Sequence, residues 1–204
     1  PYEPAPDFVP TTLVEERDAN QSHLRMSYRP QIDVEDPKER AALSIYSTLL
    51  GGSMGSRLFD EIREQRGLCY SVSAVDHAYA DVPILQLSSG LDSTKCVEAY
   101  TRMREIVGEL HADGPTEDEV QRARAYAAGR RVIAFENTNV VARYAANQAV
   151  VYGAPIDPDL SIERLDAVTL KEVAAVAKKI DPEQLSIAVV GPHSAGEFAQ
   201  VQAR

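Results

Sequence analysis

The sequence has little of what builds three common kinds of protein. Two cysteines, Cys69 and Cys96, are too few for a disulfide framework in 204 residues, and no Cys-x-x-Cys pair suggests a structural metal. No window holds the roughly 18 uncharged apolar residues of a membrane-spanning helix, and the N-terminal segment lacks the basic start and apolar run of a secretory signal. We therefore expect reduced thiols, no membrane span and, in a bacterium, a cytoplasmic location.

Basic residues are also scarce. Lysine and arginine number 21 against 31 aspartates and glutamates, which gives a net charge of −10. This charge repels phosphate backbones, so nucleic acid is a poor candidate partner. Hydrophobic residues make up 44% of the chain, enough for a folded core over residues 11–204. The proline-rich residues 1–10 are predicted to be the remnant of an interdomain linker, with a processed terminus as the alternative.

Strand and helix patterns follow each other in groups. Residues 12–17 and 21–28 suit two strands joined as a hairpin, residues 68–75 and 85–91 suit a second hairpin, and residues 185–190 suit a buried last strand. Helical patterns lie between and after them, three of them opened by Thr116, Thr169 and Ser194 with Glu three residues later. Another carries an apolar stripe at helical spacing: Cys96, Tyr100, Met103, Val107 and Leu110. This order predicts an α+β domain: a mainly antiparallel sheet of about five strands with helices packed on one face. The other face would meet a partner.

Familiar catalytic motifs are missing. There is no Gly-x-Ser-x-Gly turn and no phosphate-binding loop, and no histidine belongs to a His-Glu-x-x-His or His-x-x-Glu-His motif. The four histidines are spread along the chain: His23, His77, His111 and His193. Asp76, His77 and Asp81 cluster near the end of a predicted strand and are residue types that bind metals, but solvated turn residues are the favoured interpretation. No zinc site can be identified from the sequence.

One dense segment remains, at residues 49–72. It reads Leu-Leu-Gly-Gly-Ser-Met-Gly-Ser-Arg-Leu-Phe-Asp-Glu-Ile-Arg-Glu-Gln-Arg-Gly-Leu-Cys-Tyr-Ser-Val. This segment resembles the signature stretch in the C-terminal half-domains of the insulinase or pitrilysin-like family of inverted-zincin metallopeptidases, in the branch of the processing peptidases. Further landmarks match at residues 21–24, 114–116, 162–169 and 185–192, in the expected order. Ser53 and Cys69 are small departures from the family pattern.

The resemblance implies a divided enzyme. In this family two similar half-domains face each other around a chamber, and the zinc motif His-x-x-Glu-His belongs to one half, usually the N-terminal one. The present sequence lacks that motif. On this basis residues 11–204 are the non-zinc C-terminal half, and zinc is bound by a partner half in the same polypeptide or on another chain, in a dimeric assembly.

The resemblance also assigns two site residues. The family's Arg-x-x-x-Tyr pair matches Arg66 and Tyr70, which implies that both bind the peptide substrate and stabilise its carbonyl or oxyanion. The pattern alone leaves other interpretations open. Tyr70 shares a predicted strand face with Leu68 and Val72, which is typical of a core tyrosine, and Arg66 could merely offset a helix dipole beside Glu64.

The predicted function is therefore the substrate-binding, chamber-closing half of a zinc metalloendopeptidase, inactive alone. The alternatives are a non-catalytic structural subunit of the same family, like a core protein of a respiratory complex, and a stand-alone peptide-binding module. The acidic charge leaves a further choice open. If it lines the chamber it would favour basic peptides, and a solvated acidic surface explains it equally well.

Overall fold

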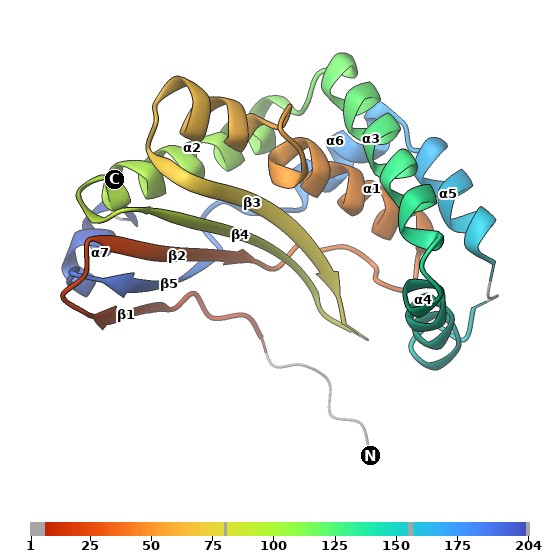
Figure 1. The fold of residues 1–204 in the computed structure, drawn as a ribbon, viewed down its shortest axis with the longest axis horizontal. Coiled ribbons are helices and arrows are strands. Elements are labelled where there is room, and N and C mark those ends of the chain that lie inside the picture. The colour runs from red at the N-terminus through yellow and green to blue at the C-terminus, as the bar shows by residue number, and fades with distance from the viewer. Residues whose placement is uncertain (1–6, 80, 155–156, 203–204) are drawn as a thin grey trace.

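A computed structural model describes residues 7–79, 81–154 and 157–202. Its strands form one sheet with helices on one face (Figure 1). The strands are β1 (Thr12–Glu16), β2 (Gln21–Tyr28), β3 (Cys69–Ala78), β4 (Pro83–Asp92) and β5 (Leu185–Gly191). Their order is β1-β5-β2-β4-β3. The β1–β5 pair is parallel and the other pairs are antiparallel. The predicted α+β fold with a mainly antiparallel sheet of five strands is thus confirmed.

The first predicted hairpin is wrong. β5 lies between β1 and β2, with Val189 level with Val14 on one side and with Leu24 on the other. In this position both edges of β5 are paired, and its alternate apolar side chains reach the core, Ile187 among them. The short turn at residues 18–20 predicted local pairing, but burial of the last strand in the sheet decided the order. The second hairpin, β3 with β4, is confirmed.

The helices are α1 (Pro37–Ser47), α2 (Cys96–Asp113), α3 (Glu117–Phe135), α4 (Thr138–Val150), α5 (Pro158–Asp166), α6 (Leu170–Lys178) and α7 (Ala195–Gln202), with short segments η1 (Thr48–Gly52), η2 (Phe59–Gln65) and η3 (Ser93–Lys95). Three of them, α3, α6 and α7, begin directly after the predicted caps Thr116, Thr169 and Ser194. The capping boxes of α3 and α6 both form. The proline-rich residues 1–6 of the predicted linker lie outside the described residues.

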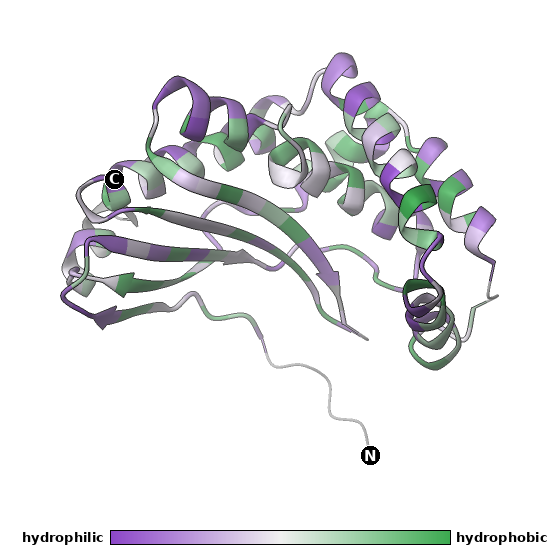
Figure 2. Ribbon diagram, viewed as in Figure 1, coloured by the Kyte–Doolittle hydropathy of each residue, from purple (hydrophilic) through white to green (hydrophobic). Residues whose placement is uncertain are grey.

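The core lies between the helices and one face of the sheet. The predicted stripe of α2 is completely buried: Cys96, Tyr100, Met103, Val107 and Leu110. Alternate residues of the central strands meet it from the sheet, as Figure 2 shows in the hydrophobic stretches along the strands and the adjoining helices. Each such side chain contributes about 1.5–3 kcal/mol by leaving water. This layer fixes the sheet on which the candidate site lies.

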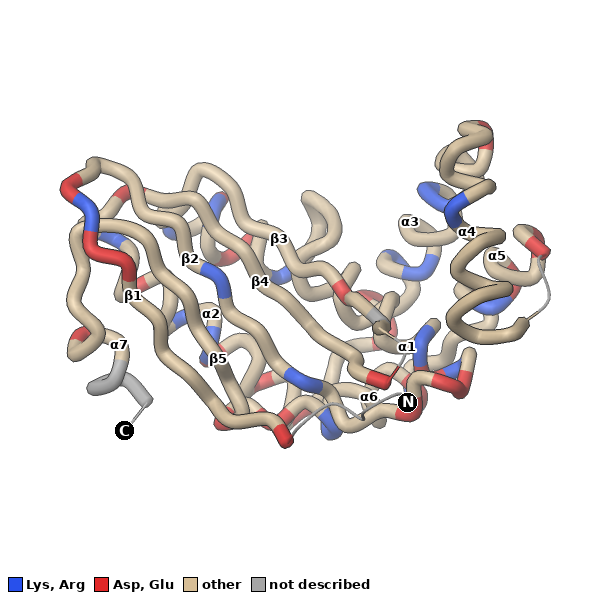
Figure 3. The backbone as a smooth tube through the Cα atoms, turned by 90° about the horizontal axis from the view of Figure 1, so that it is seen from below, with Lys and Arg blue, Asp and Glu red and all other residues tan. Residues whose placement is uncertain are grey.

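The other face of the sheet carries no helix within the described ranges (Figure 3). We call it the open face. Its outward-pointing positions follow from the register: Ser71, Ser73 and Val75 on β3, Gln86, Ser88 and Gly90 on β4, His23, Arg25 and Ser27 on β2, and Ser186, Ala188 and Val190 on β5. Beyond the β3 edge of this face stand α3 and α4. The open face is mainly small and polar, unlike the apolar face beneath it.

Candidate functional site

Arg66 and Tyr70 are four positions apart in the chain where β3 begins, at one end of the open face. Arg66 follows η2, and its backbone N–H donates to the carbonyl of Glu61 at 3.2 Å. Gly67 then turns the chain with a φ of +58°, a conformation that other residues rarely adopt. Both predicted side chains are exposed, Tyr70 to 59%. The arginine side chain makes no hydrogen bond or ion pair with another described residue.

A β-bulge turns Tyr70 outward. Cys69 and Ser71 pair with consecutive residues of β4, so Tyr70 is the extra residue in the strand. Cys69 and Val72 pack against the core, while Tyr70 and Ser71 between them are exposed. The expectation that Tyr70 shares a face with Leu68 in the core is therefore wrong, because strict alternation does not foresee an inserted residue.

Hydrogen-bonding side chains continue from this point across the open face. A Cβ placed on Gly90 would lie 3.2 Å from Ser71 Oγ and 3.8 Å from His23 Nδ1, so these two side chains flank the glycine. Arg25 lies further along β2 and donates to Gln86 Oε1 at 2.8 Å and to Ser88 Oγ at 2.9 Å. Alternation along the strand puts Arg25 on the same face as His23, but only the register reveals the neighbours of Arg25.

The acidic residues on this face lie at its margins. Glu15 is on the edge strand β1 and Asp92 ends β4, whereas the centre carries Arg25 and His23. In Figure 3 the central strands are mostly uncharged, with basic segments on β2 and acidic ones on β1. The described part of the chain therefore does not support a chamber wall lined by acidic charge.

Two ion pairs hold the segment that carries Arg66. Arg57 binds Glu119 at the start of α3 through both oxygens, at 2.5 and 3.0 Å. Burial by itself would raise the pKa of Glu119, but the hydrogen bonds from Arg57 and Thr116 outweigh it and lower the pKa to about 2. Arg102 on α2 similarly binds Glu61 of η2 at 2.5 Å. The position of Arg66 is thus fixed from two helices.

A second polar cluster lies at the same end of the sheet, on the buried side. Ser22 Oγ is 2.8 Å from His193 Nε2, and His193 Nδ1 is 3.4 Å from Glu197. The order serine, histidine, carboxylate is that of a hydrolytic triad. However, Ser22 is completely buried and its hydroxyl also donates to Ser93 at 3.0 Å. A substrate cannot reach it, so we interpret the cluster as structural.

The cysteines fit this division between an exposed and a buried side. Both are free thiols, as expected. Cys96 lies near Ser22 in the buried cluster, and burial raises the pKa of its thiol to about 12. Cys69, beside the bulge, is half-buried, and burial raises its pKa as well. Neither thiol has the lowered pKa of a nucleophilic cysteine.

The zinc that the family implies does not fit the described residues of this chain. Within those residues no three histidine, cysteine, aspartate or glutamate side chains gather closely enough to hold a metal ion. His111 bonds the carbonyl of Ala177, and Asp76 accepts a hydrogen bond from the Ser47 hydroxyl at 2.5 Å.

Across the described ranges, every helix is too short or too polar to cross a membrane.

Comparisons with known proteins agree with the α+β fold described above. An uncharacterized zinc protease of Bacillus subtilis is 28% identical over 188 residues, which cover 92% of this chain and 45% of that protein. The crystal structure of a peptidase M16 inactive domain from Pseudomonas fluorescens superimposes with a TM-score of 0.77 at 22% identity, over 91% of this chain and 44% of that one. A chain of complex III from Candida albicans gives 0.76 at 13% identity, over 95% of this chain and 49% of that one.

The family is shown by the sequence itself. Residues 1–126 match the family model described as the peptidase M16 inactive domain, and the chain belongs to that family. The resemblance found in residues 49–72 is thereby confirmed. The chain spans less than half the length of the curated relatives that it matches, 45% of the Bacillus subtilis protein and 43% of a zinc protease of Mycobacterium leprae.

Proposed function

We propose that this chain is the substrate-binding, chamber-closing half of a zinc metalloendopeptidase that hydrolyses peptides. The zinc ion and its ligands would belong to another half-domain, in the same polypeptide or on a partner chain. The family match and the zinc protease among its relatives support this proposal. The observation that carries it is that Arg66 and Tyr70, four positions apart in the chain, are both exposed at the end of an uncovered sheet face. The proposed half-domain comprises residues 11–204.

The two side chains have complementary chemistry. The guanidinium of Arg66 carries a permanent charge and several donors, and the Tyr70 hydroxyl donates a single directed hydrogen bond. Both would bind a peptide carbonyl and stabilise the negative charge that develops on its oxygen during hydrolysis. Removing one such donor typically lowers the rate by about 10² to 10³. Residues that precede and follow them are held by ion pairs and strand pairing, so the donors are positioned in advance.

Substitutions in the whole protein that contains this chain test the assignment. We expect Arg66→Ala and Tyr70→Phe each to lower peptide hydrolysis by about 10²-fold, with zinc content and thermal unfolding unchanged. Arg143→Ala and Tyr126→Phe are matched controls, because both side chains are exposed on other helices. Wild-type rates in both site variants would remove Arg66 and Tyr70 from the mechanism.

A non-catalytic structural subunit is the second candidate. The likeness in fold to a chain of complex III favours it. This candidate predicts that the whole protein hydrolyses no peptide with its metal in place and that it purifies within a larger assembly. Activity measurements on the purified whole protein, combined with its mass in solution, separate the two functions.

Three further properties belong to the leading proposal. The chain by itself would bind no stoichiometric zinc and cleave no peptide, the two halves would form a dimeric assembly, and the protein would be cytoplasmic in a bacterium. Metal analysis, light scattering and cell fractionation measure these properties one by one. Stoichiometric zinc on the chain alone would contradict the division of labour between the halves.

A further inference from the structure

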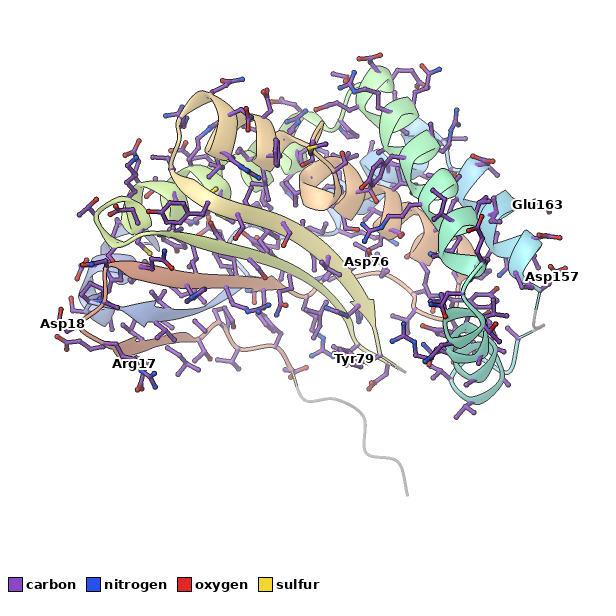
Figure 4. All side chains as sticks on the ribbon, viewed as in Figure 1. Arg17, Asp18, Asp76, Tyr79, Asp157 and Glu163 are labelled. Atoms are coloured by element: carbon purple, nitrogen blue, oxygen red, sulfur yellow. The ribbon has the colours of Figure 1, made fainter. Side chains whose placement is uncertain are left out.

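A cavity of about 550 Å³ lies beyond the far end of β3 from Tyr70. Its walls come from the end of β3 and from α1, α3, α4 and α5, and it is of the size that binds small molecules or peptide side chains. In Figure 4 the labelled Asp76 and Tyr79 mark the strand side of this region, with α4 opposite. None of its lining residues belongs to the proposed Arg66 and Tyr70 site. We call it the arginine cavity.

Three arginines line the arginine cavity: Arg40, Arg131 and Arg164. Arg40 donates to the carbonyl of Val34, and its guanidinium lies 3.9 Å from the centre of a tyrosine ring. Arg131 donates to the hydroxyl of Ser161 at 2.6 Å. Arg164 is half-buried and makes no polar contact with a described residue. Not one of the three forms an ion pair with a described carboxylate.

This lack of ion pairs is selective. Arg57, Arg102, Arg104 and Arg122 each pair with a glutamate or aspartate elsewhere in the same chain. Acidic residues outnumber basic ones by 31 to 21, so partners are plentiful. Three guanidinium groups that share one cavity, none of them paired with a described carboxylate, create a positive site inside an acidic protein.

The remaining polar groups of the cavity agree with an anionic ligand. Among the described residues that line it, Asp76 is the one carboxylate, and it already accepts a hydrogen bond from Ser47. Gln148 is 8% exposed, and its buried Oε1 has no hydrogen-bond partner among the described residues. Rotating this amide by half a turn would place its N–H donors at the same point. His77 supplies a further nitrogen at the wall.

We propose that the arginine cavity binds carboxylate groups of the peptide substrate, from acidic side chains or from the C-terminus. Guanidinium groups bind carboxylates through paired hydrogen bonds, and such bonds strengthen where water is partly excluded. A bound carboxylate would supply the negative charge that no described side chain provides to these arginines. The proposal rests on the proposed peptide-binding function, and it reverses the preference for basic peptides that the net charge of the chain suggests.

The sheet connects the two sites. Tyr70 and His77 lie seven positions apart on β3, which corresponds to about 23 Å of extended chain. A peptide held at Tyr70 would therefore need about seven extended residues to place a carboxylate in the arginine cavity. Peptides with an acidic group at this separation should gain most from it.

Equilibrium binding of labelled peptides to the whole protein, with a chelator present to stop turnover, tests the proposal. The reference peptide contains glutamines and an amidated C-terminus. One arm replaces the glutamines by glutamates, and the other restores the free C-terminal carboxylate. We expect at least one arm to bind about tenfold more tightly than the reference. A gain in the first arm assigns side chains as the source, and a gain in the second assigns the terminus. Equal affinities for all peptides would overturn the proposal.

Substitution of Arg164 connects the effect to the cavity. Because Arg164 has no polar partner in the described structure, Arg164→Gln should fold normally and abolish the gain, and Arg164→Lys should keep part of it. Arg143→Gln is the matched control, an exposed arginine of α4 outside the cavity, and should keep the gain in full. Persistence of the gain in Arg164→Gln would place the anion site elsewhere and contradict the proposal.

The proposed function and the proposed role of the arginine cavity can be contradicted independently of each other. The preference for carboxylates is measured without turnover, so it stands even when Arg66→Ala and Tyr70→Phe hydrolyse peptides at the wild-type rate. Conversely, a protein that hydrolyses peptides and loses activity in those variants, but binds acidic and neutral peptides equally, keeps its proposed function and loses only the arginine cavity as a substrate subsite.

Discussion

Ser22 and His23 are neighbours in the sequence but lie on opposite faces of the sheet. Ser22 is completely buried and bonds His193 and Ser93, while His23 lies on the open face beside Ser71. The buried cluster has the serine, histidine and carboxylate order of a hydrolytic triad, whereas only the open face is accessible to a substrate. Access decides which of them can meet a substrate, because a buried serine with satisfied hydrogen bonds contributes only to the fold.

The two faces also tolerate change differently. On the buried side Ser22 forms hydrogen bonds with His193 and Ser93, and close packing leaves these atoms no room to move. On the open face they point to solvent or to a facing partner, where a new atom finds room. The same alternation along β2, β4 and β5 therefore produces a rigid layer and an adaptable one.

The largest expected difference in stability is between substitutions of two glycines, Gly191 on the buried side of the sheet and Gly90 on the open face. A Cβ on Gly191 would lie 2.2 Å from Ser22 Oγ and 3.0 Å from His193 Cδ2, whereas a Cβ on Gly90 would lie 3.2 Å from Ser71 Oγ. We expect Gly191→Ala to lower the free energy of unfolding by about 3 kcal/mol, through overpacking and a broken hydrogen bond. Gly90→Ala should lower it by less than about 1 kcal/mol. Urea denaturation measures both, and equal losses would show that the open face is as tightly packed as the core.

A second pair of substitutions separates stability from activity. Ser22→Ala leaves a buried His193 nitrogen without its partner, so we expect a loss of about 2 kcal/mol in unfolding free energy and an unchanged rate of peptide hydrolysis per folded molecule of the whole protein. Tyr70→Phe should show the reverse, unchanged stability and a lower rate. Loss of hydrolysis in a stable Ser22→Ala protein would instead establish the buried cluster as a catalytic triad.

Local signals in the sequence predicted much of the fold. The capping boxes at Thr116 and Thr169 and the stripe of α2 from Cys96 to Leu110 depend on residues close together in the chain, and all of them are confirmed. The false hairpin of β1 and β2 arose because the pairing of β5 depends on residues more than 150 positions away. Periodicity carries no information about such distant partners.

The resemblance proposes the residues of the candidate site but says nothing of their geometry. The resemblance supplied Arg66 and Tyr70, but the bulge that exposes Tyr70 is visible only in the register of β3 against β4. The arginine cavity gave no signal at all, since Arg40, Arg131 and Arg164 come from separate helices. The Ser22–His193 contact could not be predicted for the same reason, because the partners are 171 positions apart in the sequence.

The smallest expected effect concerns the ion pair between Arg57 and Glu119, which holds the segment that carries Arg66. Glu119 and Glu172 occupy the same position in two capping boxes, but Arg57 binds only Glu119. We expect Glu119→Gln to lower the unfolding free energy by about 1.5 kcal/mol at neutral pH, and Glu172→Gln to lower it by about 0.5 kcal/mol.

The pH dependence follows from the pKa of Glu119, which lies at about 2 in the folded protein against 4.5 in the unfolded chain. Because the folded pKa is the lower one, the stabilisation is present in full above pH 4.5 and is lost as the pH falls towards 2. Wild type and Glu119→Gln should therefore differ in thermal unfolding at pH 7 and converge near pH 2. A difference that stays constant down to this pH would mean that the Glu119 carboxylate charge does not hold η2 against α3, and that Arg66 is positioned by other contacts.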